Sequence, residues 1–172
     1  MSDPGREFRK VPIETLTALV QSVQRGFYRF NESVGVDVHF LKRETSLSYS
    51  IPYGVVISVI GVVGNVRGGL SVILAQDGFD KYVSALTGGL IPPDLGNEIA
   101  MSCIGEMLNM VAGRMALEMS QCGFAIDITP PQTFCGDKIR QVESDDTAHI
   151  ILPYSFGGSS CGVHLVINSR SV

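Results

Sequence analysis

The chain has 172 residues with a formal net charge of -4, and it is 45% hydrophobic but only 17% charged. This length and composition predict one domain with a well-filled core, and the acidic balance without a cluster of Lys and Arg argues against a nucleic-acid partner. The first ten residues are polar and no apolar run is long, which predicts a cytoplasmic protein with no signal peptide and no membrane insertion.

The first half of the chain predicts one long helix followed by strands. Residues 1–10 are expected to be loose. Pro12 suits the first turn of a helix, and Gly64-Asn65 between two apolar runs predicts a tight hairpin turn. The elements expected are a helix at about 12–30, strands at 34–41, 54–63 and 66–74 around a polar loop at 42–52, and a short helix from 76 to Gly88-Gly89.

A second long helix, from Asn97 to about Gln121, has two different faces. One face is apolar and predicts contact with the core: Ala100, Ile104, Met107, Leu108, Val111 and Met115. The opposite face carries Glu98, Ser102, Glu106, Asn109 and Gly113. An ordinary solvated face is the simplest interpretation. The lack of Lys and Arg on this face, and the presence of Asn in a helix interior, favour a functional role instead.

After this helix the chain is expected to return to strands. A short strand is predicted at 124–128, followed by Thr129-Pro130-Pro131. The polar segment 137–146 is predicted to be exposed, and the apolar runs at 147–154 and 162–167 predict a second hairpin. The predicted fold is therefore α+β, with a largely antiparallel sheet and long helices on one face.

The same order of elements occurs twice and indicates an internal repeat. Val36-Asp37-Val38 follows the first helix as Ile126-Asp127-Ile128 follows the second, 90 positions later. Gly64 to Gly68 joins the first hairpin as Gly158 to Gly162 joins the second, 94 positions later. We expect two α-β-β-β units, at about 12–89 and 94–168, within a single domain at 11–172.

The repeat also allows the two long helices to be compared. With an offset of 90, Glu106 and Asn109 correspond to Leu16 and Leu19. If the polar pair only faced solvent, polar residues would be expected in both helices. The difference predicts that the second helix presents something that the first helix lacks.

The spacing Ser102-x-x-x-Glu106-x-x-Asn109, with Pro130 and Pro131 21 and 22 residues after the Asn, resembles the signature of the CheC/CheX/FliY phosphatases. The family pattern is Asp or Ser, three residues, Glu, two residues, Asn, and Pro about 22 residues later; either proline could hold that position. The duplicated layout extends the resemblance over nearly the whole chain. CheC-type members generally carry the motif in both halves, whereas this chain carries it once and is more similar to CheX-like proteins.

This resemblance implies a phosphatase that acts on the phosphoaspartate of a CheY-type receiver domain. It implies that Asn109 positions the attacking water, because a carboxamide accepts a hydrogen bond from water and donates one to a phosphoryl oxygen. Glu106 would pair with the partner's active-site lysine. The phosphatase would need no cofactor of its own, since the receiver domain brings Mg²⁺. A homodimer is also implied, as is typical of CheX-like proteins.

Four further residues are implied in contacts with the partner or in shaping the site. Ser102 would bind the partner's backbone, and a merely solvated Ser102 is the alternative. Gly113 would allow close approach of the partner, and helix-on-sheet packing is the alternative. Pro130 and Pro131 would shape the loop beside the helix.

Two other functions remain open from the sequence. One is a non-catalytic module of the same fold that binds a response regulator or a flagellar switch component, and the other is an unrelated small-ligand or sensory domain. Intact Glu106 and Asn109 favour the phosphatase.

No zinc site is expected, because the cysteines lack CxxC pairing and are predicted to be packed thiols: Cys103, Cys122, Cys135 and Cys161. His39 is predicted to be solvated or hydrogen-bonded, and a metal site at His149 and His164, possible neighbours across the second hairpin, is disfavoured for want of a third ligand.

Overall fold

The computed structural model describes residues 11–45, 53–140, 148–156 and 159–171, without the side chains of 148 and 159–171. The helices are α1 (Ile13–Ser33), α2 (Gln76–Thr87) and α3 (Glu98–Gln121), with a 3-10 turn η1 (Lys42–Glu44). The strands are β1 (Val38–Phe40), β2 (Gly54–Gly64), β3 (Val66–Leu74), β4 (Ile126–Ile128), β5 (Gln132–Ile139), β6 (Ala148–Phe156) and β7 (Ser159–Ser171).

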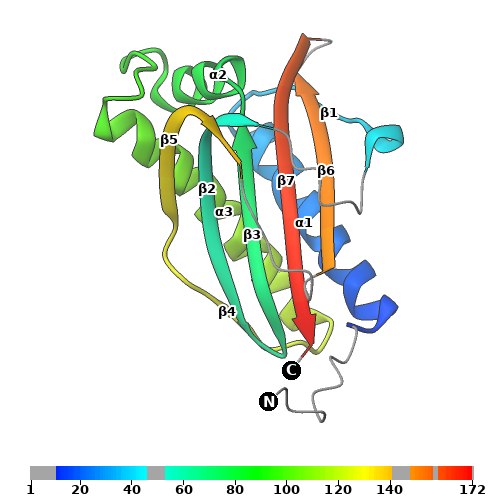
Figure 1. Ribbon diagram of the computed structural model, residues 1–172. Helices are drawn as coiled ribbons and strands as arrows, with labels where there is room; N and C mark the ends of the chain where they lie inside the picture. The colour runs from blue at the N-terminus through cyan, green and yellow to red at the C-terminus, as the bar shows by residue number, and fades with distance from the viewer. Residues whose placement is uncertain (1–10, 46–52, 141–147, 157–158, 172) are drawn as a thin grey trace, which may run out of the picture.

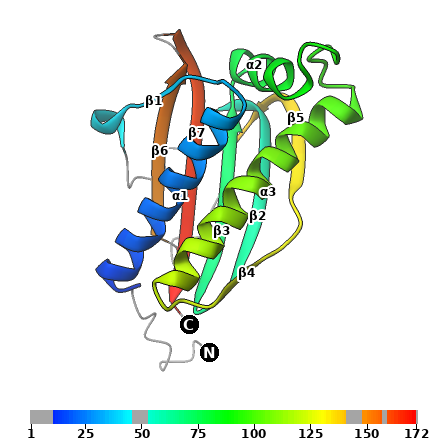
Figure 2. The same cartoon turned by 180° about the vertical axis from the view of Figure 1, so that it is seen from behind.

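The sheet places two hairpins side by side at its centre. The strand order is β1-β6-β7-β3-β2-β4, and β5 also pairs with β2. Every pairing between described strands is antiparallel. Helices α1 and α3 lie on the same face of the sheet (Figures 1 and 2). The predicted α+β class, with an antiparallel sheet and long helices on one face, is confirmed.

The strand pairings follow the offsets of the sequence repeat. Val38 of β1 lies opposite Phe156 of β6, and Ile128 of β4 lies opposite Val62 of β2. Val38 and Ile128 are 90 positions apart, and Val62 and Phe156 are 94 positions apart. Each unit therefore gives its first short strand to the hairpin of the other unit.

The two long helices follow a different offset. Seven buried residues of α1 each lie 85 positions before a buried residue of α3. These pairs are Thr15 and Ala100, Leu19 and Ile104, Ser22 and Met107, Val23 and Leu108, Gly26 and Val111, Phe27 and Ala112, and Phe30 and Met115. One of these pairs is in direct contact, because a Cβ on Gly26 would lie 3.0 Å from the carbonyl oxygen of Val111.

This offset corrects the comparison of the helices made from the sequence. The α1 residues that correspond to Glu106 and Asn109 are Gln21 and Gln24, which have the same exposed and half-buried positions. Leu19, which the offset of 90 placed opposite Asn109, is a core residue with 2% of its surface exposed. Both helices therefore have a polar outer face, and the faces differ in which polar groups they carry.

The offset of the helices differs from the offset of the strands because the chain between helix and paired strand is longer in the second unit than in the first. Helix α3 continues from Val111 to Gln121, whereas α1 continues from Gly26 only to Ser33. The longer helix and the turn after it add five residues before the paired strand. Apolar strands could be aligned from the sequence, but this insertion could not be located there.

Three local predictions need correction. The strand expected at 34–41 is only β1, because Gly35 (φ 68°) turns the chain at the end of α1. The hairpin register, with Val62 opposite Gly68, is centred on Asn65 and excludes a two-residue turn at Gly64-Asn65. Asn65 instead makes two hydrogen bonds with Ala125. Its backbone N–H donates to the carbonyl oxygen of Ala125 over 2.9 Å, and its side-chain oxygen accepts from the backbone N–H of Ala125 over 2.6 Å.

The third correction concerns the segment after the prolines. Strand β5 was not predicted, and the expected exposed segment 137–146 begins inside it. Predictions for residues 1–10, 46–52 and 141–147 lie outside the described residues. The second hairpin is confirmed in longer form, with β7 beginning at Ser159, inside the segment expected to join the two strands.

A buried polar contact fixes the end of α1 against α2. The Tyr82 hydroxyl donates to Asn31 Oδ1 over 2.7 Å, and Asn31 Nδ2 donates to the carbonyl oxygen of Phe27 over 2.8 Å. Burial raises the pKa of Tyr82 far above its ordinary value, so the phenol stays a donor. The ring of Tyr82 also meets Phe156 edge-on, with centroids 5.1 Å apart.

Candidate functional site

The site is built on α3, which begins at a well-formed cap. The side chain of Asn97 accepts hydrogen bonds from the backbone N–H groups of Ile99, at 2.9 Å, and Ala100, at 3.3 Å. These bonds satisfy two donors that would otherwise be unpaired at the helix start. The apolar side of α3 is buried against the core over most of the length of the helix. The outer face is therefore held in a fixed orientation.

The polar residues predicted from the sequence lie together on this outer face. Ser102, Glu106 and Gly113 are exposed, and Asn109 is half-buried between them. Glu106 and Asn109 are one helical turn apart, so their side chains can reach one ligand. Within the described part of the chain, neither side chain has a hydrogen bond or an ion pair.

Gly113 lies in open space on this face. No heavy atom lies within 4 Å of the position that a Cβ would take. The alternative interpretation of Gly113, helix-on-sheet packing, is therefore wrong. A glycine here leaves the helix backbone accessible beside Asn109, as the close approach of a partner requires.

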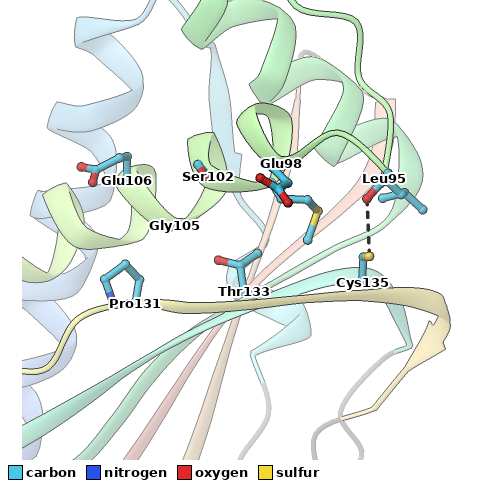
Figure 3. Close-up of a pocket in the computed structure, with 10 residues that line it drawn as sticks. Leu95, Glu98, Ser102, Gly105, Glu106, Pro131, Thr133 and Cys135 are labelled. Atoms are coloured by element: carbon cyan, nitrogen blue, oxygen red, sulfur yellow. Dashed lines mark hydrogen bonds between the residues drawn. The ribbon is translucent and has the colours of Figure 1, made fainter.

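A groove of about 540 Å³ separates the N-terminal half of α3 from β5 (Figure 3). Its α3 side includes Glu98, Ser102 and Glu106, and its β5 side includes Thr133 and Cys135. Its charged lining residues are carboxylates only, which favours a cationic or neutral occupant. Glu106 thus belongs both to the groove and to the polar face, whereas Asn109 lies outside the groove.

The two prolines lie differently at the entrance to β5. Pro131 lines the groove, and Pro130 is exposed. A Cβ on Gly105 would lie 3.2 Å from the Thr133 hydroxyl oxygen and 3.5 Å from Pro131, so this glycine allows β5 to approach α3. Thr133 is held in turn by a 2.9 Å hydrogen bond with the buried Ser58. Pro131 is therefore the proline that shapes the wall beside Glu106.

Sequence reasoning missed the contribution of β5 and Gly105. Strand β5 is short of apolar residues, and its side chains do not alternate clearly between polar and apolar types. The glycine directly before Glu106 was the available signal, because a glycine inside a helix often permits close packing.

The two histidines considered as possible neighbours across the second hairpin do not come together. In the β6–β7 register, His149 lies opposite Asn168 and His164 opposite Pro153, so the two histidines are not cross-strand neighbours. Among the described residues, no group of three or more His, Cys, Asp or Glu side chains is placed to hold a metal. His39 is exposed, and its Nε2 lies 3.3 Å from Asp37 Oδ2, which agrees with the prediction of a solvated or hydrogen-bonded histidine.

The cysteines are only partly as predicted. Cys103 is half-buried, and its burial raises the pKa of its thiol. Cys122 and Cys135 are exposed, so the prediction of packed thiols is wrong for these two. The side chain of Cys161 lies outside the described residues.

Comparison with known proteins gives the chain a family. The model for the family described as chemotaxis phosphatase CheX matches residues 56–155, which include Glu106, Asn109 and both prolines. A CheY-P phosphatase CheX from Thermotoga maritima is 33% identical over 125 residues, which cover 73% of this chain and 77% of that protein.

Solved structures support the fold. A CheC-like chemotactic protein from Shewanella oneidensis has a TM-score of 0.73 at 19% identity, covering 91% of this chain and 98% of that one. The CheX–CheY–BeF3–Mg²⁺ complex from Borrelia burgdorferi contains a chain with a TM-score of 0.71 at 19% identity, covering 89% of this chain and 98% of that one.

Among the described residues, no helix combines the length and the apolar character that a membrane-spanning segment needs. Homodimer formation stays a prediction, because the structure contains one chain. The motif and the fold both lead to the family that the comparisons identify: the chain belongs to the CheX family of chemotaxis phosphatases.

Proposed function

We propose that this protein hydrolyses the phosphoaspartate of a CheY-type receiver domain, with Glu106 and Asn109 acting as a pair. The observation that carries the proposal is the position of this pair on the outer face of a helix whose other side is buried, without a hydrogen bond or ion pair to another described residue. The relative from Thermotoga maritima is named a CheY-P phosphatase, and the relative from Borrelia burgdorferi was crystallised with CheY. Both names support the same class of partner.

Asn109 positions the attacking water. An acyl phosphate is an activated anhydride, so its hydrolysis mainly requires a water in line with the bond that breaks. The Asn109 carboxamide accepts a hydrogen bond from this water and donates one to a phosphoryl oxygen. The water oxygen forms the new bond to phosphorus, the bond to the aspartate oxygen breaks, and the products are inorganic phosphate and a free carboxylate. Asn109 is half-buried, which limits its rotamers and favours one orientation.

Glu106 sets how the helix enters the partner. Its exposed carboxylate pairs with the active-site lysine of the receiver domain, in a charge-assisted contact. The receiver supplies Mg²⁺, and this chain contributes no metal ligand to the reaction. Ser102 contacts the partner at the rim of the groove, Gly113 leaves room for its backbone, and Pro131 supports the groove wall while Pro130 continues the same loop.

The test is the lifetime of a phosphorylated CheY-type receiver domain, measured by phosphate release with and without this protein. The wild type is expected to shorten the lifetime. Asn109→Ala is expected to lower the maximal rate by roughly 100-fold while the affinity for the receiver changes little, because it removes a group that acts on the water. Glu106→Ala is expected to weaken binding.

The outcomes separate the phosphatase from a module that only binds. Binding without any change in the phosphorylated lifetime would contradict the proposal and support the non-catalytic alternative. Hydrolysis that survives Asn109→Ala at the wild-type rate would show that the assignment of the water to Asn109 is wrong.

A further inference from the structure

Helix α3 exposes three large apolar side chains next to its polar face. Ile99 is 58% exposed, Met110 is 42% exposed and Leu117 is 62% exposed. Their spacings of 11 and 7 residues place them within about 20° of one line along the helix, over about 27 Å. We call these three residues the apolar row.

The second long helix provides an internal control for the apolar row. At the offset of 85 defined by the buried residues, the corresponding positions of α1 are Glu14, Arg25 and Glu32. All three are charged and exposed. The same packing position on the same sheet therefore accepts charged residues, and nothing in the packing of the free chain requires apolar residues on α3.

The apolar row is continuous with the proposed site. Met110 directly follows Asn109 and lies one turn after Glu106, while Gly113 lies between Met110 and Leu117. Single exposed apolar residues are ordinary on protein surfaces, but a line of three beside polar groups is typical of a contact surface. A molecule that covers Glu106 and Asn109 must also meet Met110.

We propose that the apolar row is the docking surface for the receiver domain, which meets it with an apolar patch next to its phosphorylated aspartate. This inference rests on the proposed function and adds where the binding free energy comes from. Glu106 and Asn109 are polar and lose water on binding, so they contribute orientation more than affinity. Burial of the row supplies the affinity.

The experiment places a charged residue at each end of the row, where α1 also has charged residues. Ile99→Glu combined with Leu117→Lys places charges at both ends and leaves Glu106, Asn109 and Met110 unchanged. Affinity is measured for a CheY-type receiver domain that carries beryllofluoride and Mg²⁺, and hydrolysis is measured with the phosphorylated receiver. We expect Kd and KM to rise about tenfold or more while kcat stays within twofold of the wild type.

Phe134→Lys is the matched control. Phe134 is 52% exposed and lies opposite Ile57, whose side chain belongs to the small cluster on the sheet face away from α3. It should leave Kd, KM and kcat unchanged. Leu117→Lys alone keeps the test available if the double variant melts at a lower temperature than the wild type, and it should show a smaller rise of the same kind.

The results also separate this inference from the proposed function. Unchanged Kd and KM in the row variants, with Asn109→Ala still slowing hydrolysis, would overturn the row alone. A wild type that binds the receiver without hydrolysing it would overturn the proposed function, and the Kd values would still decide about the row. Row variants that change the oligomeric state of the free protein but not Kd would show that a second copy covers the row, which also overturns the inference.

Discussion

Helix α1 shows Gln21, Gln24 and Tyr28 at the positions where helix α3 shows Glu106, Asn109 and Gly113. Both helices bury the same seven positions against one sheet, so the scaffold is equivalent on the two sides. The difference between the faces lies in side-chain chemistry. The two helices share their buried positions, and the residues proposed to act on the partner differ at exposed and half-buried positions.

Each α1 residue lacks something that the proposed reaction uses. Gln21 has no charge to pair with a lysine. Gln24 does carry a carboxamide, but it lies next to the buried Tyr154, whose pKa is raised mainly by its burial. Tyr28, 41% exposed, fills space that Gly113 leaves open on α3. The α1 face is therefore not expected to act as a second site.

The largest expected effect comes from giving α3 the residue that α1 has at the open position. Gly113→Tyr is expected to lower kcat/KM by roughly 100-fold, because the ring displaces the partner from Asn109. The melting temperature should not fall, since no atom lies within 4 Å of a Cβ at this position. Phosphate release from the phosphorylated receiver domain and thermal melting measure the two effects. Gly113→Ala is the control and should lose much less activity; wild-type activity in the Tyr variant would exclude close approach at Gly113.

A smaller effect is expected from Glu106→Gln, which places the α1 residue at the position of the acid. Loss of a charge-assisted contact is expected to raise KM about tenfold, corresponding to about 1.4 kcal/mol. The salt dependence of binding should also weaken, because one ion pair is lost. Titrations at several NaCl concentrations measure both quantities. Gln21→Glu, the matched change on α1, should alter neither; a variant Glu106→Gln that keeps the wild-type KM and salt dependence contradicts the proposed ion pair.

The smallest effect on activity is expected in the shared scaffold. Tyr82→Phe removes the hydroxyl that donates to Asn31 and leaves a buried acceptor without its donor. The free energy of unfolding is expected to fall by about 1–3 kcal/mol. Denaturant unfolding measures this loss, and the rate of phosphate release below the melting temperature should stay unchanged. A lower kcat in the folded variant would show that the scaffold and the α3 face are coupled.

Much of the fold and of the α3 face could be predicted from the sequence, because the sequence patterns that indicate them are local or periodic. Helix α3 and its polar face followed from apolar spacing, and the fold class followed from the order of helices and strands. The registers of the edge strands agree with the offsets of 90 and 94 read from short repeats. The motif led to the family, which the comparisons confirm.

The remainder depends on contacts between distant segments. The helix offset of 85 depends on which residues of the two helices are buried, since an insertion between helix and strand leaves no local mark in the sequence. Strand β5 forms because β2 offers it a free edge, although its own sequence alternates poorly. The hydrophobic character of Ile99 and Leu117 does not by itself show whether these side chains are exposed or buried.

The most direct test of the difference between the two faces compares Asn109→Ala with Gln24→Ala in one assay. Both substitutions remove a carboxamide from equivalent positions, and the lifetime of the phosphorylated receiver domain reports the result. If only the α3 face acts on the phosphoaspartate, Asn109→Ala lengthens the lifetime by roughly 100-fold relative to the wild-type protein, and Gln24→Ala leaves it unchanged. Equal effects of the two substitutions, or no effect of Asn109→Ala, would contradict this account.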